Sequence, residues 1–267
     1  MVLEHLASTA DAPRAFNVTD LLPHWMKRLE NGWGSWICTM TRETYGQVKQ
    51  GLPVERLGGL SNAMAIRHAA AHAYYDSIDE VVDVARKSMF THRDFHALGG
   101  GEFFARVTHR VINGETPSNA IESSALEMDS FFQDKVAQAM EKVKEATDEN
   151  SALSKEIFAD DLAITSMARL WDVGRSEPIK VGKASPTEGT LPGAVYFILK
   201  YENEKDGLKK ALQQNTMVGG DNASRGIAIG MVLGAYNGVN AIPLVWRETL
   251  DEWDYCEKLL NRLPLLK

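Results

Sequence analysis

The residues best suited to chemistry lie in one short segment, which reads Val218-Gly219-Gly220-Asp221-Asn222-Ala223-Ser224. Two glycines permit a tight turn and the close approach of a ligand to the backbone. The polar residues after them stand at the expected start of a helix, whose free N–H groups suit a phosphate or a carboxylate. Asp221 and Ser224 add the hard oxygen donors that Mg²⁺ prefers. Because Asp221 or Asn222 could equally be a plain helix cap, spacing alone leaves both interpretations open.

Two histidine pairs have the i, i+4 spacing that can chelate zinc on one helical face. They are His68 with His72, and His92 with His96. Neither pair has the acid of an HExxH motif or a third ligand nearby in the sequence. We therefore expect surface or cleft histidines rather than a zinc centre.

Other patterns are weaker. The adjacent acids Asp160 and Asp161 point about 100° apart on a helix, which favours helix-start charge over catalysis. Aromatic residues cluster early in the sequence, at Trp25, Trp33, Trp36 and Tyr45. The segment 32–36 among them predicts a packed loop, with aromatic stacking on adenine as the alternative. The sequence has no GxSxG elbow, no P-loop and no GxGxxG followed by an acid, so serine hydrolase, NTPase and Rossmann functions have no support.

Charge and cysteine usage limit the class of protein. The 267 residues include 29 basic and 36 acidic side chains, a net charge of −7, which argues against a general nucleic-acid binder. Cys38 and Cys256 form no CxxC pair, which fits a reducing, cytoplasmic compartment. The N-terminus lacks the pattern of a secretory signal. The uncharged run 226–246 is broken by Asn237, Gly238 and Pro243, so we expect a buried helix and no membrane span.

Long proline-free runs with apolar periodicity predict an all-α chain forming one compact domain over residues 1–267. A helix of about seven turns is expected from Ile121 to Val143. A capping box at Ser77 and Glu80 predicts one helix start, and Asp94 predicts another whose helix stops at Asn113-Gly114. Further helices are expected near 18–30, 40–50, 157–171, 189–202, 205–215, 224–238 and 247–262.

Glycines recur every four residues on one face of the helix that follows the Gly219-Gly220 turn. They are Gly226, Gly230, Gly234 and Gly238. Such a stripe predicts that another helix backbone approaches closely and that this helix is central, which would make the turn rigid enough to bind a ligand.

The sequence resembles the ADP-ribosylglycohydrolase family in several segments that keep the family's order. The span "LKKALQQNTMVGGDNASRGIAIGMVLGAYNGVNAIPLVW" resembles its C-terminal signature, in which a GGDTDT turn leads into a Gly-rich helix. "GGLSNAMAIRHAA" at 58–70 is similar to the SNGALMR-type segment, and "MFTHRDFHAL" at 89–98 to the S-x-THxxxxA segment. "LPGAVYFILKY" at 191–201 resembles the helix before the metal turn.

This resemblance implies an all-helical, orthogonal multi-helix domain that binds Mg²⁺ and recognises ADP-ribose or an ADP-ribosylated protein. Active members hydrolyse ADP-ribosyl glycosidic bonds. The resemblance makes Asp221 a metal ligand and puts Ser224 in the place of a threonine ligand. It assigns no catalytic residue, and its implied ligand-binding residues are Ser61, Asn62, Arg67, His92, Gly219, Gly220 and Asn222.

The sequence also departs from the family pattern. The glycine-rich GDALG segment and the TDDT-type turn that supply further metal ligands have no counterpart in it. Ala223 occupies the second aspartate position of GGDTDT, and alanine cannot ligate a metal. This pattern resembles the J-crystallin branch of the family. We expect either a sequence short at its N-terminus or a natural non-catalytic member, and hence an impaired hydrolase or a binding or structural protein on the same fold.

Overall fold

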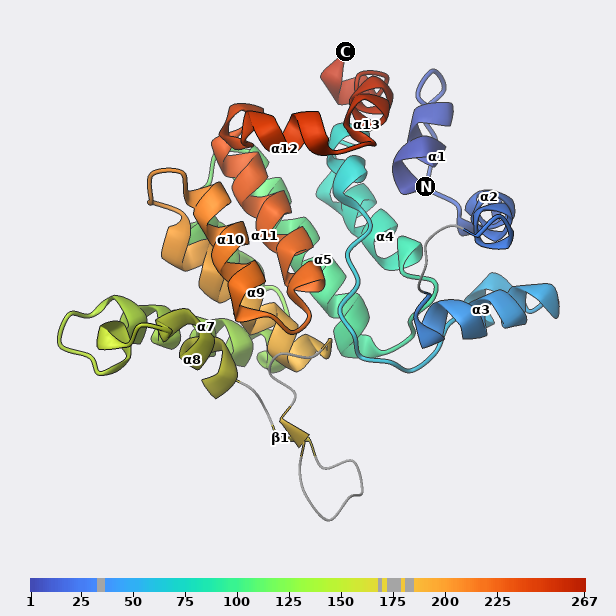
Figure 1. Cartoon of the computed structure of the whole chain (residues 1–267). Helices are drawn as coiled ribbons and strands as arrows, with labels where there is room; N and C mark the ends of the chain where they lie inside the picture. Colours follow the sequence, from blue (N-terminus) through green and yellow to red (C-terminus); the bar gives the residue numbers. More distant parts are fainter. Residues whose placement is uncertain (33–36, 168–169, 172–178, 181–184) are drawn as a thin grey trace. The chain divides into compact units, whose positions relative to one another are not determined.

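The computed structural model describes residues 1–32, 37–167, 170–171, 179–180 and 185–267 (Figure 1). Its contacts divide the chain into two units: Met1–Ala105 with Arg247–Lys267, and Arg106–Trp246. The first unit holds helices α1 (Val2–Ser8), α2 (Val18–Glu30), α3 (Thr39–Lys49), α4 (Ile78–Ser88) and α13 (Trp253–Leu260). The second holds α6 (Pro117–Leu126), α7 (Ser130–Thr147), α8 (Ala159–Ser166), α9 (Thr187–Tyr201), α10 (Gly207–Val218) and α11 (Asn222–Asn237). Helices α5 (Phe95–Ile112) and α12 (Leu244–Thr249) each cross a boundary.

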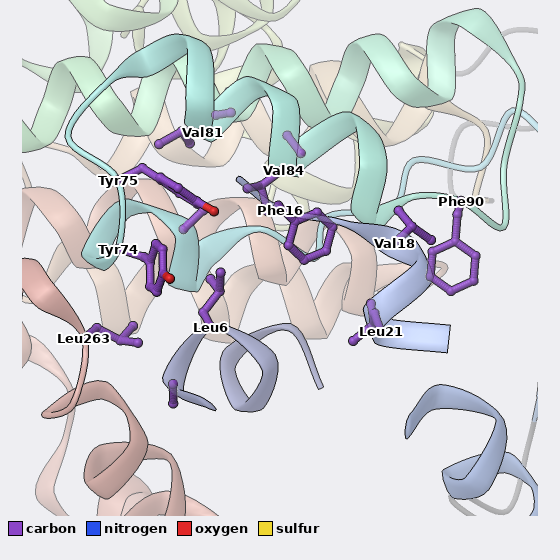
Figure 2. Packing of buried hydrophobic residues seen from close by; sticks show 14 of the residues in the cluster. Leu6, Phe16, Val18, Leu21, Tyr74, Tyr75, Val81, Val84, Phe90 and Leu263 are labelled. Carbon is purple, nitrogen blue, oxygen red and sulfur yellow. The ribbon is translucent and has the colours of Figure 1, made fainter. Parts of the chain in front are cut away.

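A buried apolar cluster forms the core of the first unit (Figure 2). Helix α4 buries Val81, Val84 and Ala85, which share one helical face because they are three or four residues apart. Helix α1 packs against α13, and the Tyr255 hydroxyl donates to Glu4 Oε1 at 2.8 Å. The core therefore joins elements from the two ends of the sequence. Its labelled members in Figure 2 are Leu6, Phe16, Val18, Leu21, Tyr74, Tyr75, Val81, Val84, Phe90 and Leu263.

Helix α9 is the most deeply buried element of the second unit, since residues 187 and 189–198 are all buried. A helix that is apolar on every side must be surrounded, and α9 packs against α7, α10 and α11. Gly193 makes one of these approaches possible, because a Cβ there would lie 2.8 Å from Arg225 Cδ of α11. Helix α9, with α11 against it, is thus the centre of this unit.

Three expected helices differ in extent. The predicted seven-turn helix is two helices, α6 and α7, because the Asp129 carboxylate caps α7 by accepting from Phe131 N at 2.9 Å. The helix expected over 247–262 is likewise divided into α12 and α13. The helix expected over 157–171 ends at Ser166, and a two-residue antiparallel pair follows between Leu170–Trp171 and Ile179–Lys180.

Helix ends follow the sequence signals in part. Asp94 Oδ1 accepts from Ala97 N at 2.9 Å, and Gly114 after α5 has φ +97°, as predicted. Ser77 occupies the N-cap of α4, but its side chain makes no cap hydrogen bond, so the predicted capping box is wrong. The all-α prediction is confirmed over the described residues. None of the helices described there is long and apolar enough to cross a bilayer.

Candidate functional site

The Gly219-Gly220 turn joins α10 to α11. Both glycines have positive φ, +75° and +67°, a conformation that residues with a Cβ rarely adopt. Asp221 is the N-cap of α11: its Oδ1 accepts from Ser224 N at 3.1 Å and its Oδ2 accepts from Ser224 Oγ at 2.8 Å. The helix-cap interpretation of Asp221 is therefore confirmed, and both carboxylate oxygens bond to Ser224.

A buried arginine on α11 also stabilises this turn. Arg225 is fully buried, and its Nη2 donates to the Gly219 carbonyl at 2.5 Å. Its Nε donates to Asn215 Oδ1 at 2.7 Å, while Asn215 Nδ2 donates to the Asn222 carbonyl at 2.8 Å. Burial lowers the pKa of Arg225, and the charge of Asp221 opposes that shift. The network fixes the backbone on both sides of Asp221.

Neither Arg225 nor Asn215 is among the residues for which the sequence predicts a role. A signal existed for the arginine: it is the single charged residue in the otherwise uncharged run from Asn222 to Trp246. A charge in a helix that is otherwise apolar is rare without a structural or functional reason. Asn215 offers no comparable signal, because polar residues surround it in the sequence.

The turn does not supply the ligands that a magnesium ion needs. Mg²⁺ demands near-octahedral oxygen coordination, yet the turn offers side-chain oxygens only from Asp221, Asn222 and Ser224, and Asp221 and Ser224 bond to each other. Ala223 contributes no donor. Across the described ranges, no group of three or more His, Cys, Asp or Glu side chains could hold a metal. The residues present therefore do not fit the ion, and the metal-ligand roles of Asp221 and Ser224 stay predictions.

Backbone pairing brings two of the family-like segments together in the first unit. Gly59 N donates to the Thr91 carbonyl at 3.1 Å, and Arg93 N donates to the Gly59 carbonyl at 2.8 Å. These bonds form an isolated parallel bridge between Gly59 and His92. The segment that leads into Ser61 therefore lies beside the segment that carries His92.

His92 and Arg67 form the polar part of this arrangement. His92 is 6% exposed, and its Nδ1 lies 2.9 Å from Thr91 Oγ1. Burial lowers the pKa of His92 to about 4, and the charge of Arg67 adds to that shift. Arg67 donates from Nη1 to the Ser88 carbonyl at 3.1 Å, and burial lowers its pKa. Near neutral pH, His92 is thus an uncharged hydrogen-bonding ring beside a cation.

The remaining predicted ligand residues are accessible only in part. Ser61 and Asn62 are half-buried, and Ser61 Oγ accepts from Ala63 N at 3.3 Å, closing a small turn. Within the first unit, Arg67 lies close enough to His92 for its charge to lower the pKa of that ring, and Ser61 follows the Gly59–His92 bridge by two residues. Within the second unit, Gly219, Gly220, Asp221, Asn222 and Ser224 lie in one turn and helix start.

The glycine stripe of α11 does not do what its spacing predicts. Among the described residues, nothing lies within 4 Å of a Cβ built at Gly230 or Gly234, and Gly226 is in ordinary contact with Asn215. The buried face of α11 instead consists of Arg225, Ala228, Ile229, Val232 and Leu233. The close approach comes from Gly193 of α9, as described above.

The histidine and aromatic predictions have mixed outcomes. His68 is fully buried, so the expectation of a surface or cleft position is wrong for it. Its ring lies 5.8 Å from that of His72, and burial lowers the pKa of His68 to about 3. Trp33 and Trp36 lie outside the described residues.

Asp160 lies in the first turn of α8, where the sequence predicts helix-start charge, and it accepts three hydrogen bonds. Their donors are the Tyr196 hydroxyl at 2.7 Å, the Tyr201 hydroxyl at 2.8 Å and Lys200 Nζ at 2.5 Å. Burial first, then the charge of Asp160, raises the pKa of both tyrosines. Both oxygens of this carboxylate accept hydrogen bonds from α9, which anchor α8 to α9 and favour a structural role.

Comparison with known proteins agrees with this fold. The chain is 24% identical over 221 residues to the ADP-ribosylhydrolase ARH3 of Bos taurus, a match that covers 77% of this chain and 58% of the relative. It is 25% identical over 223 residues to ADP-ribosylhydrolase ARH3 of Xenopus tropicalis, covering 76% and 60%. The chain thus spans three-fifths or less of the length of these curated relatives.

A solved structure described as an ADP-ribosylglycohydrolase-related protein complex shares the fold, with a TM-score of 0.60 and 18% identity. The alignment covers 100% of this chain and 78% of that one. The family model for ADP-ribosylglycohydrolase matches residues 1–267, so the chain belongs to the ADP-ribosylglycohydrolase family.

Proposed function

We propose that this chain recognises ADP-ribose or an ADP-ribosylated protein, and that it hydrolyses the ADP-ribosyl glycosidic bond only poorly. The observation that carries this proposal is the Asp221 carboxylate, whose two oxygens bond to Ser224 while Ala223 stands at the second acidic position. Similarity to two ADP-ribosylhydrolases supports the ligand class.

The chemistry explains why the missing carboxylate matters. In metal-assisted glycoside hydrolysis, a bound cation orients the sugar hydroxyls and activates water, and this requires several fixed oxygen ligands. The side chains of this turn do not provide them. His92, with a pKa of about 4, is mostly unprotonated near pH 7 and is a poor proton donor to a leaving group there. The residues around His92 therefore lack an effective proton donor, and the Asp221 turn lacks the full set of metal ligands, that fast hydrolysis needs.

Binding needs less than catalysis does. The Gly219-Gly220 turn leaves room for a ligand, since no described atom lies within 4 Å of a Cβ built at Gly219. Arg67 supplies a half-buried cation suited to an anionic group, beside the uncharged His92. Ser61, Asn62 and Asn222 are the further proposed contacts. We expect weak affinity, with a Kd from high micromolar to millimolar, about −4 to −6 kcal/mol.

Calorimetry with ADP-ribose tests the binding proposal. Arg67→Gln should weaken binding by about tenfold, because it removes the cation beside His92. Arg93→Gln is the matched control: it removes an exposed arginine from the same backbone bridge and should leave the affinity unchanged. No heat at several millimolar ADP-ribose would remove the binding function and leave a structural role for the scaffold.

Release of ADP-ribose tests the catalytic half. The substrates are an ADP-ribosylated protein and peptides modified on arginine or serine, each with and without Mg²⁺. We expect no enzymatic turnover. Turnover near 1 s⁻¹ that depends on Mg²⁺ and is abolished by Asp221→Ala would contradict the proposal, since it would show that other acids complete the site.

Two more specific expectations, a cofactor and a compartment, belong to the same proposal. Magnesium is the cofactor that the family resemblance implies, and a full metal site would need acids beyond Asp221 and Ser224. The cytoplasm is the proposed compartment, which agrees with Cys38 and Cys256 both being free thiols.

A further inference from the structure

The side chain of Arg225 is fully buried and contacts the backbone of the Asp221 turn. Arg225 is among the largest fully buried side chains of the described chain, and burying a guanidinium is costly unless its charge and its donors are compensated. Its two hydrogen bonds go to neutral oxygens, the Gly219 carbonyl and Asn215 Oδ1. Within the described residues its Nη1 has no hydrogen-bond partner. The charge that favours its protonated form is that of Asp221.

Three elements are shaped around this side chain. Helix α9 has a glycine, Gly193, where any Cβ would lie 2.8 Å from Arg225 Cδ. Helix α10 presents the Asn215 amide, which accepts from Arg225 and donates to the Asn222 carbonyl. The turn itself presents the Gly219 carbonyl. Gly193 gives the Arg225 side chain space, and the Asn215 amide and the Gly219 carbonyl accept its hydrogen bonds. Such a hydrogen-bonded arrangement indicates a specific structural role for the buried charge.

We propose that Arg225 is the positioning residue of the Gly219–Asp221 turn and that its guanidinium does, inside this chain, what a bound cation would do at such a turn. It holds the Gly219 carbonyl and balances the Asp221 carboxylate, so the turn folds without a divalent ion. The proposal rests on the proposed function only in locating the ligand site at this turn.

Electrostatics gives the proposal a measurable consequence. A fixed positive charge next to Asp221 lowers the attraction of that carboxylate for any second cation, because like charges repel strongly where water is excluded. The chain as it stands should therefore gain no stability from Mg²⁺. Removing the guanidinium should also remove the stabilising effect of the Asp221 charge, which can be measured by neutralising Asp221.

The first experiment compares two helix caps by thermal unfolding of the full chain. Asparagine caps a helix as well as aspartate does, so Asp221→Asn keeps the cap and removes the charge. Asp129→Asn makes the same change at the N-cap of α7, where the described residues place no buried arginine. We expect Asp221→Asn to lower the Tm by several degrees more than Asp129→Asn. Equal shifts would overturn the proposal.

The second experiment measures the Tm with and without 10 mM MgCl₂, a concentration on the order of those that saturate weak sites. Neither wild type nor Arg225→Met should respond, because the turn has too few oxygen ligands to hold the ion, but Arg225→Met should melt several degrees lower. In the Arg225→Met background, Asp221→Asn should lower the Tm much less than it does in wild type, because the charge that Asp221 balances is already gone. Asp160→Asn is the control background, since it breaks a different buried network of the same unit and should leave the effect of Asp221→Asn unchanged.

A wild-type Tm that rises with Mg²⁺ and stops rising in Asp221→Asn would overturn the proposal, because it would place a metal beside the arginine. A folded Arg225→Met in which Asp221→Asn lowers the Tm as much as it does in wild type would also overturn it. If Arg225→Met does not fold, the comparison of the two caps still decides. Failure of ADP-ribose to bind is a separate outcome, which removes the proposed function and leaves the cation result intact.

Discussion

The two regions that the family resemblance singles out are held by different means. In the first unit, backbone bonds from Gly59 to Thr91 and Arg93 place the Ser61 segment beside His92. In the second, side chains hold the turn: Asn215 and Arg225 bond to its backbone, and Ser224 bonds to Asp221. One region depends on the absence of a Cβ, and the other depends on the identity of a few polar groups.

Because of this difference, the two regions should tolerate different substitutions. A backbone bridge tolerates most changes of polar side chain but does not tolerate larger side chains where two backbone segments are in contact. A turn held by side chains accepts modest changes of bulk at its surface but rejects the loss of a buried hydrogen-bonding group. Substitutions can therefore test the comparison one region at a time.

The largest expected effect is that of Gly58→Ala, at the backbone bridge. Gly58 has φ +91°, and a Cβ there would lie 2.7 to 2.9 Å from the backbone of Phe90, Thr91 and His92. Backbone atoms cannot rotate away, so we expect a loss of about 3 to 5 kcal/mol in the free energy of unfolding. Gly51→Ala is the control: φ is +76° with nothing described within 4 Å, so only conformational strain of about 1 kcal/mol applies. Urea unfolding measures both, and similar losses would contradict the importance of the bridge.

The next effect is a loss of stability on acidification in the first unit. The folded-state pKa of His92 is about 4 and that of His68 about 3, both below the unfolded value of 6.5. Above pH 6.5 both states are neutral and nothing is lost. Below it the unfolded state takes up protons first, so stability falls until the folded pKa is reached, by about 2 kcal/mol per histidine at pH 5. His92→Gln should remove its share, as measured by urea midpoints at pH 7 and pH 5. An unchanged pH dependence would contradict the burial of a neutral ring.

Sequence reasoning predicted the helices well because amphipathic periodicity and end signals are local. Helix α2 lies where the pattern placed it, and Asp94 and Gly114 mark the two ends of α5. It failed at Asp129, because an acid within a periodic run can cap a new helix instead of continuing the old one. Apolar periodicity alone cannot show whether the chain continues one helix through such an acid or starts a second helix there, because tertiary packing decides between the two.

The candidate site was predicted unevenly for a related reason. The cap at Asp221 and the order of the family-like segments can be read along the chain. The bridge from Gly59 to His92 and the fit of Gly193 around Arg225 join residues more than thirty positions apart, and no spacing rule contains them. The glycine stripe of α11 misled for the same reason, since a small residue permits a close approach without causing one.

A smaller effect should follow from Asn215→Ala, at the turn held by side chains. The substitution leaves Arg225 Nε without its acceptor in buried surroundings and the Asn222 carbonyl without its donor in half-buried surroundings. We expect a loss of about 2 kcal/mol in the free energy of unfolding. Asn237→Ala removes an amide that makes one bond near the exposed end of α11, and it should cost well under 1 kcal/mol. If the two losses are equal, the turn is not held by its side chains.

The smallest expected effect compares one hydroxyl in each region, through Ser224→Ala and Ser61→Ala. Ser224 Oγ donates to Asp221 Oδ2 at 2.8 Å, while its backbone N–H keeps the cap bond to Oδ1 after the substitution. Losing one of two bonds to a charged, half-buried carboxylate should cost about 1 kcal/mol. Ser61 Oγ accepts a longer bond of 3.3 Å from Ala63 N in a segment that backbone bonds already place. Its loss should therefore change stability by no more than about 0.5 kcal/mol, and urea midpoints on the two variants measure the difference. If Ser61→Ala costs as much as Ser224→Ala, the Ser61 segment relies on its side chains as the Asp221 turn does, and the contrast between the two regions fails at that point.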